Sequence, residues 1–61
     1  MKYILKPLIC DIYRKGKHVG KFRKIGGIWL FVGSQTKYPL NSTELIELAR
    51  DLHTLNSIGE I

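Results

Sequence analysis

A chain of 61 residues with a formal net charge of +5 is long enough for one small domain and no more. Its single cysteine excludes an intrachain disulfide, and neither that cysteine nor the two histidines stand at the spacing of a zinc site. We therefore expect no metal or other cofactor. We also expect a single domain over residues 1–61 that depends on packing or self-association for its stability.

The N-terminal residues lack the pattern of a signal peptide, because Lys6 and Pro7 interrupt their apolar stretch. The longest apolar run, residues 28–32, is far too short to span a membrane. A free thiol without an export signal is typical of a reducing compartment, so we expect a cytoplasmic protein.

The first predicted strand covers residues 4–13, which are rich in β-branched and aromatic side chains. Pro7 has no N–H to donate to a neighbouring strand, so this strand should lie at a sheet edge or begin near Leu8. A turn that contains Gly16 follows it.

Two further strands are predicted on either side of a glycine pair. Residues 18–25 and 28–33 flank Gly26 and Gly27, and two glycines between apolar runs favour a two-residue hairpin turn. Residues 36–40 are expected to form a loop or a fourth short strand.

A helix is predicted in the last third of the chain. Asn41 and Ser42 are both good N-caps, and Glu44 stands at capping-box spacing from Asn41. Asn56 is the expected stop, and residues 57–61 are expected to form a flexible tail. Between the N-cap and Asn56, apolar side chains recur at three- and four-residue steps, at Leu45, Leu48, Ala49, Leu52 and Leu55.

The predicted fold is therefore α+β, with the order β-β-β-α: a three-stranded antiparallel meander with one C-terminal helix packed on one face. The glycine hairpin places Phe22, Trp29 and Phe31 on one face, and Lys21 and Arg23 on the other. Burying unpaired mid-strand charges beneath leucines is very costly. We therefore expect the helix to cover the aromatic face.

The register of the first hairpin stays open at this stage. A two-residue turn places Ile9 and Tyr13 on the aromatic face, and Leu8, Cys10 and Ile12 on the aliphatic one. A three-residue turn reverses the two sets.

Charge is distributed unevenly along the chain. Residues 1–40 contain nine Lys or Arg residues and one acid, whereas residues 41–61 contain one base and four acids. This asymmetry favours nucleic-acid binding, to DNA rather than RNA, through the basic hairpin, because phosphates attract its cations and a β-ribbon fits the major groove. The alternative is that these lysines have no binding role and keep the exposed strands soluble. The candidate contacts are Lys15, Lys17, Lys21, Arg23 and Lys24, of which Arg23 is the one suited to a base edge.

The rival hypothesis is an adaptor or inhibitor that acts by protein–protein interaction. One helix covers one face of the sheet, and monomers rarely leave a large apolar patch bare. A second copy (giving a homodimer), an acidic protein surface or nucleic acid could cover it. The candidate interface residues are Val19, Ile28, Leu30 and Val32.

Catalysis is not expected. Cys10 lies opposite Lys21 if the first turn has two residues, and a nearby cation lowers the pKa of a thiol. No histidine base is placed beside it, however, and the chain has no paired carboxylates and no phosphate-binding glycine loop.

Overall fold

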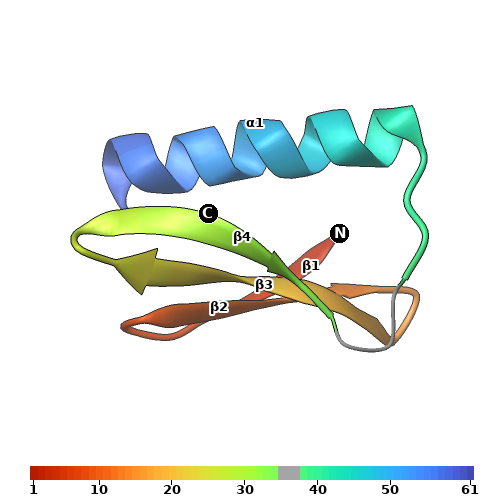
Figure 1. The fold of residues 1–61 in the computed structure, drawn as a ribbon, viewed down its shortest axis with the longest axis horizontal. Helices are drawn as coiled ribbons and strands as arrows, with labels where there is room; N and C mark the ends of the chain where they lie inside the picture. Colours follow the sequence, from red (N-terminus) through yellow and green to blue (C-terminus); the bar gives the residue numbers. More distant parts are fainter. Residues whose placement is uncertain (35–37) are drawn as a thin grey trace.

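The computed structural model describes residues 1–34 and 38–61, which form a four-stranded antiparallel sheet with one helix across it (Figure 1). The elements are β1 (Lys2–Leu5), β2 (Ile9–Arg14), β3 (Lys17–Ile25), β4 (Ile28–Gly33) and α1 (Ser42–Ile58). The strand order β1-β2-β3-β4 is a meander. The α+β class is confirmed, whereas the predicted number of strands is too small by one.

The extra strand arises because residues 4–13 form two strands instead of one. β1 ends at Leu5 and β2 begins at Ile9, and the two pair antiparallel. The Lys6 N–H donates to the Ile9 carbonyl at 2.8 Å and closes the reversal between them. Proline fixes φ at a value that suits a turn, so Pro7 marks a change of direction, and β2 begins just after it, close to the expected start near Leu8.

Both remaining hairpins have two-residue turns. Gly26 and Gly27 have φ values of 60° and 81°, as a type I′ turn requires, and the predicted glycine hairpin is confirmed. Lys15 and Gly16, with φ values of 51° and 78°, form the corresponding turn between β2 and β3.

A β-bulge interrupts the β2–β3 hairpin. Tyr13 pairs with His18, but Ile12 pairs with Gly20, so Val19 is an extra residue in β3. Because of this shift, the residues of β2 from Ile9 to Ile12 point to the opposite face from the one they would occupy without the bulge.

The bulge corrects two sequence-based expectations. Cys10 pairs with Phe22 and lies on the aromatic face, although the turn has two residues, and Ile12 lies there too. Val19 is 2% exposed and belongs to the core, so its expected place on the open aliphatic face is wrong. The physical reason is that two successive residues, Val19 and Gly20, oppose one residue of β2.

Helix α1 has well-defined ends. The Asn41 side chain accepts the Glu44 N–H at 2.9 Å, and the Glu44 carboxylate accepts the Asn41 N–H at 2.9 Å, which confirms the predicted capping box. The expected stop at Asn56 is wrong, because α1 continues to Ile58. It ends at Gly59, whose φ of 79° is the left-handed C-cap conformation.

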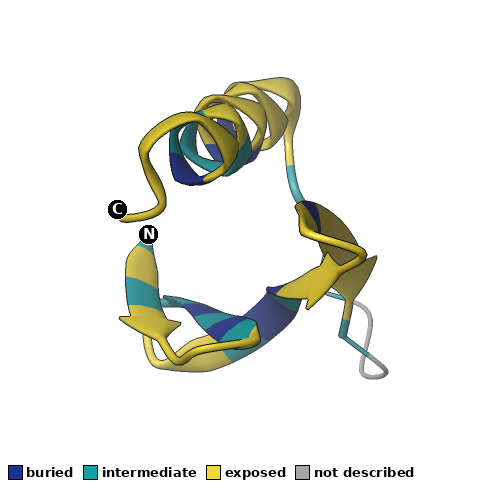
Figure 2. Cartoon of the chain, turned by 90° about the vertical axis from the view of Figure 1, so that its left-hand side faces the viewer, coloured by how far each residue is buried: buried dark blue, intermediate teal, exposed yellow. Residues whose placement is uncertain are grey.

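The core lies between α1 and one face of the sheet (Figure 2). Leu48 and Leu55 of α1 are buried there with Phe22 and Trp29, as expected, at exposures of 6% or less. Phe31 is on the same face but stays 41% exposed at the sheet edge. The segment predicted at residues 36–40 lies partly outside the described residues, and its described part has no regular structure.

Candidate binding surface

The sheet face turned away from α1 is the candidate binding surface, and we call it the open face (Figure 1). Cross-strand partners in an antiparallel sheet point to the same side, so the register defines its members. They are Lys2 and Ile4 of β1; Ile9, Asp11 and Tyr13 of β2; His18, Lys21, Arg23 and Ile25 of β3; and Ile28, Leu30 and Val32 of β4.

Aliphatic side chains form much of the open face. Three of the four predicted interface residues, Ile28, Leu30 and Val32, lie on it, and it also carries Ile4 and Ile25. All five are between 39% and 57% exposed. An apolar group of this kind is a feature of binding surfaces.

Two cations lie within this aliphatic group. Lys21 pairs across the sheet with Asp11 and Val32, and Arg23 lies on the same face two residues along β3. The carboxylate of Asp11 is used elsewhere: it lies 3.9 Å from the Lys6 ammonium and 3.1 Å from Nε2 of His18. In the described part of the chain, neither Lys21 nor Arg23 takes part in an ion pair.

The acids of α1 are all directed toward groups on the helix side of the molecule. Each is bound to a cation or a hydroxyl in the N-terminal half of the chain, and among the described residues none of them pairs with a cation of the open face. Glu44 pairs with Nε of Arg14, Glu47 accepts from the N-terminal ammonium of Met1 at 2.7 Å, and Asp51 accepts from the hydroxyl of Tyr3.

This packing raises the pKa values of two side chains on the helix side, Tyr3 and Arg14. Burial, followed by the hydrogen bond to Asp51, raises the pKa of the Tyr3 hydroxyl far above its ordinary value. A hydrogen bond to the Tyr38 hydroxyl is the main cause that raises the pKa of Arg14. Tyr3 and Arg14 therefore keep their protons while they join β1 and β2 to the helix layer.

Cys10 does not lie opposite Lys21, although the turn between β2 and β3 has two residues. It faces Phe22 instead, because the bulge shifts the register of β2. The thiol is fully buried, and burial, with a smaller effect from the charge of Asp11, raises its pKa. Cys10 is therefore a small apolar residue of the core.

The five cations predicted to bind nucleic acid do not share one face. Lys21 and Arg23 lie together on the open face, and Lys15 is at the tip of the β2–β3 turn. Lys17 and Lys24 lie on the helix side of β3.

Strand alternation puts Lys24 on the opposite face from Arg23, and the bulge at Val19 turns Lys17 to the helix side. Lys17 pairs with Arg14, whose guanidinium reaches Glu44 at the start of α1. The ammonium of Lys24 lies 6.0 Å from the ring centroid of Trp29, at the range of a cation–π contact.

Lys2 is an open-face cation outside the predicted set of nucleic-acid contacts. It pairs with Tyr13, and it alternates with Tyr3, which points to the core. The alternation of Lys2, Tyr3 and Ile4 is the sequence signal for β1, but a single strand predicted over residues 4–13 does not include Lys2.

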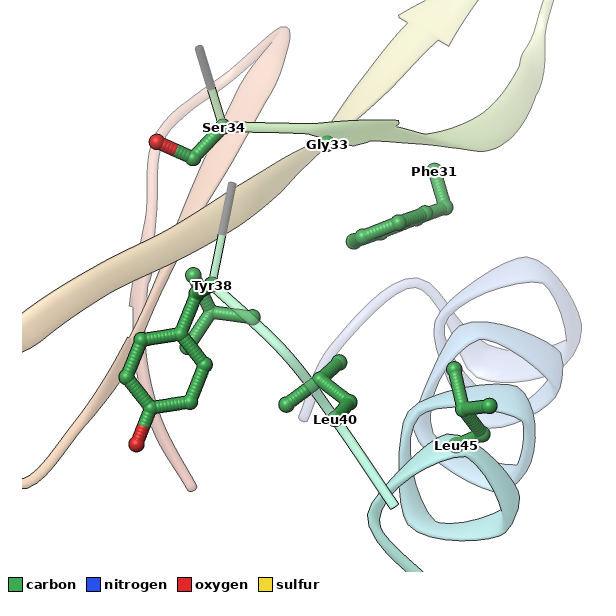
Figure 3. A pocket seen from close by; sticks show the side chains of 7 residues that line it. Phe31, Gly33, Ser34, Tyr38, Leu40 and Leu45 are labelled. Carbon is green, nitrogen blue, oxygen red and sulfur yellow. The ribbon is translucent and has the colours of Figure 1, made fainter. Parts of the chain in front are cut away.

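The edge of β4 borders an apolar hollow of about 330 Å³ (Figure 3). Phe31 and Gly33 of β4 line one side of it, and Leu45 of α1 lines another. The segment that leads into the helix contributes Tyr38 and Leu40. A second hollow of about 190 Å³, also lined by Phe31 and Leu45, continues between β4 and α1.

Metal and membrane sites are not evident in the described residues. In residues 1–34 and 38–61, no three His, Cys, Asp or Glu side chains are grouped closely enough to hold a metal ion. None of the helical structure in this part of the chain has the length and apolar character needed to cross a membrane.

Comparison with known proteins gives no family for this chain: no family model, curated protein or solved structure matches it.

Proposed function

We propose that this is a small cytoplasmic binding protein, not an enzyme, and that it binds duplex DNA through the open face. Lys2, Lys21 and Arg23 contact phosphates, and Arg23 also has the guanidinium fork that can reach a base edge. The observation that supports this most is the division of charge between the two layers. The acids of α1 are engaged on the helix side, while Lys21 and Arg23 on the other side form no ion pair with any described residue.

The geometry of β3 suits contact with successive phosphates. Lys21 and Arg23 are two residues apart on one strand, which is roughly 7 Å. The adjacent aliphatic residues of β4 can make apolar contacts of the type that thymine methyl groups accept. Duplex RNA is the poorer target, because its major groove is too deep and narrow for side chains to read.

Salt dependence tests the proposal directly. If three phosphates are neutralised, the logarithm of the affinity falls against the logarithm of the salt concentration with a slope of about −3. The double variant Lys21→Gln/Arg23→Gln should reduce this slope to about −1, because only one of the three contacts remains. Titration of a labelled duplex at several salt concentrations measures both slopes.

The matched control is Lys17→Gln/Lys24→Gln. It changes two cations on the same strand and lowers the net charge equally, from +5 to +3, but it alters the helix side. It should leave the slope at about −3. Equal losses in the two double variants would show that net charge alone drives binding, and the open face would have no special role.

The exposed aliphatic group favours a second candidate function, in which the open face binds an acidic protein surface as an adaptor or inhibitor. Apolar contacts in such a complex are much less sensitive to salt than phosphate contacts. A partner whose binding is lost on Leu30→Ser and changes little with salt supports this candidate over DNA.

A further inference from the structure

The outer edge of β4 carries backbone groups that face away from the sheet. β4 is the last strand of the meander, and the two-residue turn pairs Ile28 with Ile25. In an antiparallel ladder, alternate residues direct their N–H and C=O groups to opposite sides. Trp29, Phe31 and Gly33 therefore direct theirs to the outside.

One end of this edge is closed by a side chain. The Trp29 N–H donates to Oδ1 of Asn56 at 2.8 Å, and Nδ2 of Asn56 donates to the Trp29 carbonyl at 3.1 Å. The amide thus forms the same two bonds as a neighbouring strand. Among the described residues, nothing comparable binds the outward groups of Phe31 and Gly33.

We propose that this free edge pairs antiparallel with the same edge of a second copy, so that two sheets join into one continuous sheet. The register is centred on Val32. Phe31 of each copy exchanges N–H···O=C bonds with Gly33 of the other. A register centred on Phe31 is excluded, because it opposes Gly33 to Trp29, whose groups Asn56 already occupies.

Side-chain shape supports the Val32-centred register. Phe31 is a large apolar residue that is 41% exposed, and in this register it stands opposite a glycine. A Cβ atom at Gly33 would meet nothing within 4 Å, and Gly33 lines the hollow of about 330 Å³ (Figure 3). An aromatic side chain that covers a glycine on the next strand is a known means of stabilising a sheet.

The chemistry of β4 favours a second copy as the occupant. Residues 28–33 contain no charged side chain, so two β4 strands can lie side by side without opposing like charges. The cations of β3 in the two copies are separated by three strand spacings, roughly 14 Å, which exceeds the Debye length of about 8 Å at physiological salt. The net charge of +5 therefore does not prevent this contact.

The pairing has a consequence for the open face. A two-fold axis perpendicular to the sheet keeps both helices on one side and joins the two open faces on the other. The inference itself rests on the β4 edge and does not depend on the ligand of the open face.

The test compares two variants that add the same charge to β4. Gly33→Lys introduces a side chain where Phe31 of the second copy lies, while the isolated chain has room for it. Ile28→Lys alters the open face, outside the proposed contact, at a residue that is 57% exposed. Sedimentation equilibrium over a wide concentration range gives the dimer dissociation constant, and circular dichroism confirms that each variant folds.

We expect the unaltered protein to dimerise, Gly33→Lys to raise the dissociation constant at least about tenfold, and Ile28→Lys to leave it unchanged within a factor of about two. Amide hydrogen exchange of the unaltered protein is a second measure. Phe31 and Gly33 should become protected as the concentration rises, whereas Trp29 is protected throughout. A protein that stays monomeric at all concentrations overturns the inference. A dimer that is broken by Ile28→Lys but not by Gly33→Lys also overturns the inference, because such a dimer forms through the open faces.

Discussion

At the scale of single residues, two glycines that oppose each other in the sheet differ in whether the fold has room for a side chain at their positions. Gly20 and Gly33 are cross-strand partners in β3 and β4. A Cβ atom at Gly20 would lie 2.6 Å from the Val32 carbonyl oxygen and 3.0 Å from the Phe31 ring, whereas one at Gly33 would meet nothing within 4 Å. Gly20 is therefore required by the packing of this chain, and Gly33 is not.

Alanine at each position gives a direct prediction. Gly20→Ala should lower the free energy of unfolding by about 1–3 kcal/mol, because a backbone carbonyl cannot move aside easily. Gly33→Ala should change it by less than about 0.5 kcal/mol. Urea unfolding at low protein concentration measures both. If Gly20→Ala is as stable as the parent, β3 and β4 do not approach as closely as the structure indicates.

Local sequence signals were sufficient for the elements that depend on local chemistry. The capping box at Asn41 and Glu44 and the turn at Gly26–Gly27 involve neighbouring residues, and the sequence predicted both. The mid-strand charges also placed the open face correctly, because burying Lys21 beneath the helix is unfavourable at any register.

Features that depend on distant contacts were not predictable in the same way. The bulge at Val19 has no local sign, and it places a buried residue and Gly20 against one residue of β2. β1 was missed because the reversal at Pro7 lacks the glycine that marks the other two turns. These two misses explain why Val19 was assigned to the open face and why Lys2 was not.

At the scale of elements, Asn56 joins the C-terminal part of α1 to the edge of β4. Its amide binds both backbone groups of Trp29, and tertiary contact therefore explains why a residue that often ends helices lies inside this one. The same contact shields one part of the sheet edge from pairing with other chains.

Asn56→Ala should remove both bonds and lower the free energy of unfolding by about 1–3 kcal/mol, since it leaves the Trp29 N–H and C=O unpaired. The Trp29 amide should also exchange faster. The control is Ser57→Ala, because the Ser57 hydroxyl donates to the His53 carbonyl within the same helix at 2.8 Å and contributes no bond to the sheet among the described residues. This change should cost less than about 0.5 kcal/mol. Unchanged protection of Trp29 in Asn56→Ala would contradict the role of the side chain.

At the scale of the whole molecule, the charge asymmetry of the sequence becomes an asymmetry between two layers. The acids of α1 neutralise groups of the N-terminal half on the helix side, among them Arg14 and the N-terminus. This arrangement holds the helix on the sheet and at the same time leaves the open face cationic. One distribution of charge thus contributes to both the fold and the proposed binding surface.

The same helix-side packing makes the fold sensitive to alkaline pH. Burial, followed by the hydrogen bond to Asp51, raises the pKa of Tyr3 from its ordinary value of 10.0, and burial raises the pKa of Cys10 from 9.0. Above these ordinary values the unfolded chain has released protons that the folded chain still holds. Because the unfolded state then binds fewer protons, the free energy of unfolding decreases as the pH rises.

We therefore expect stability to fall above pH 9 through Cys10 and more steeply above pH 10 through Tyr3. Tyr3→Phe should be less stable at neutral pH, because it lacks the hydrogen bond to Asp51. Above pH 10, however, its stability should fall less steeply, by at most about 1.4 kcal/mol per pH unit for one titrating group. Urea unfolding in reducing buffers from pH 8 to pH 11 measures both slopes. Equal slopes for the two proteins above pH 10 would show that the Tyr3 hydroxyl is not the half-buried hydrogen-bond donor that joins β1 to α1.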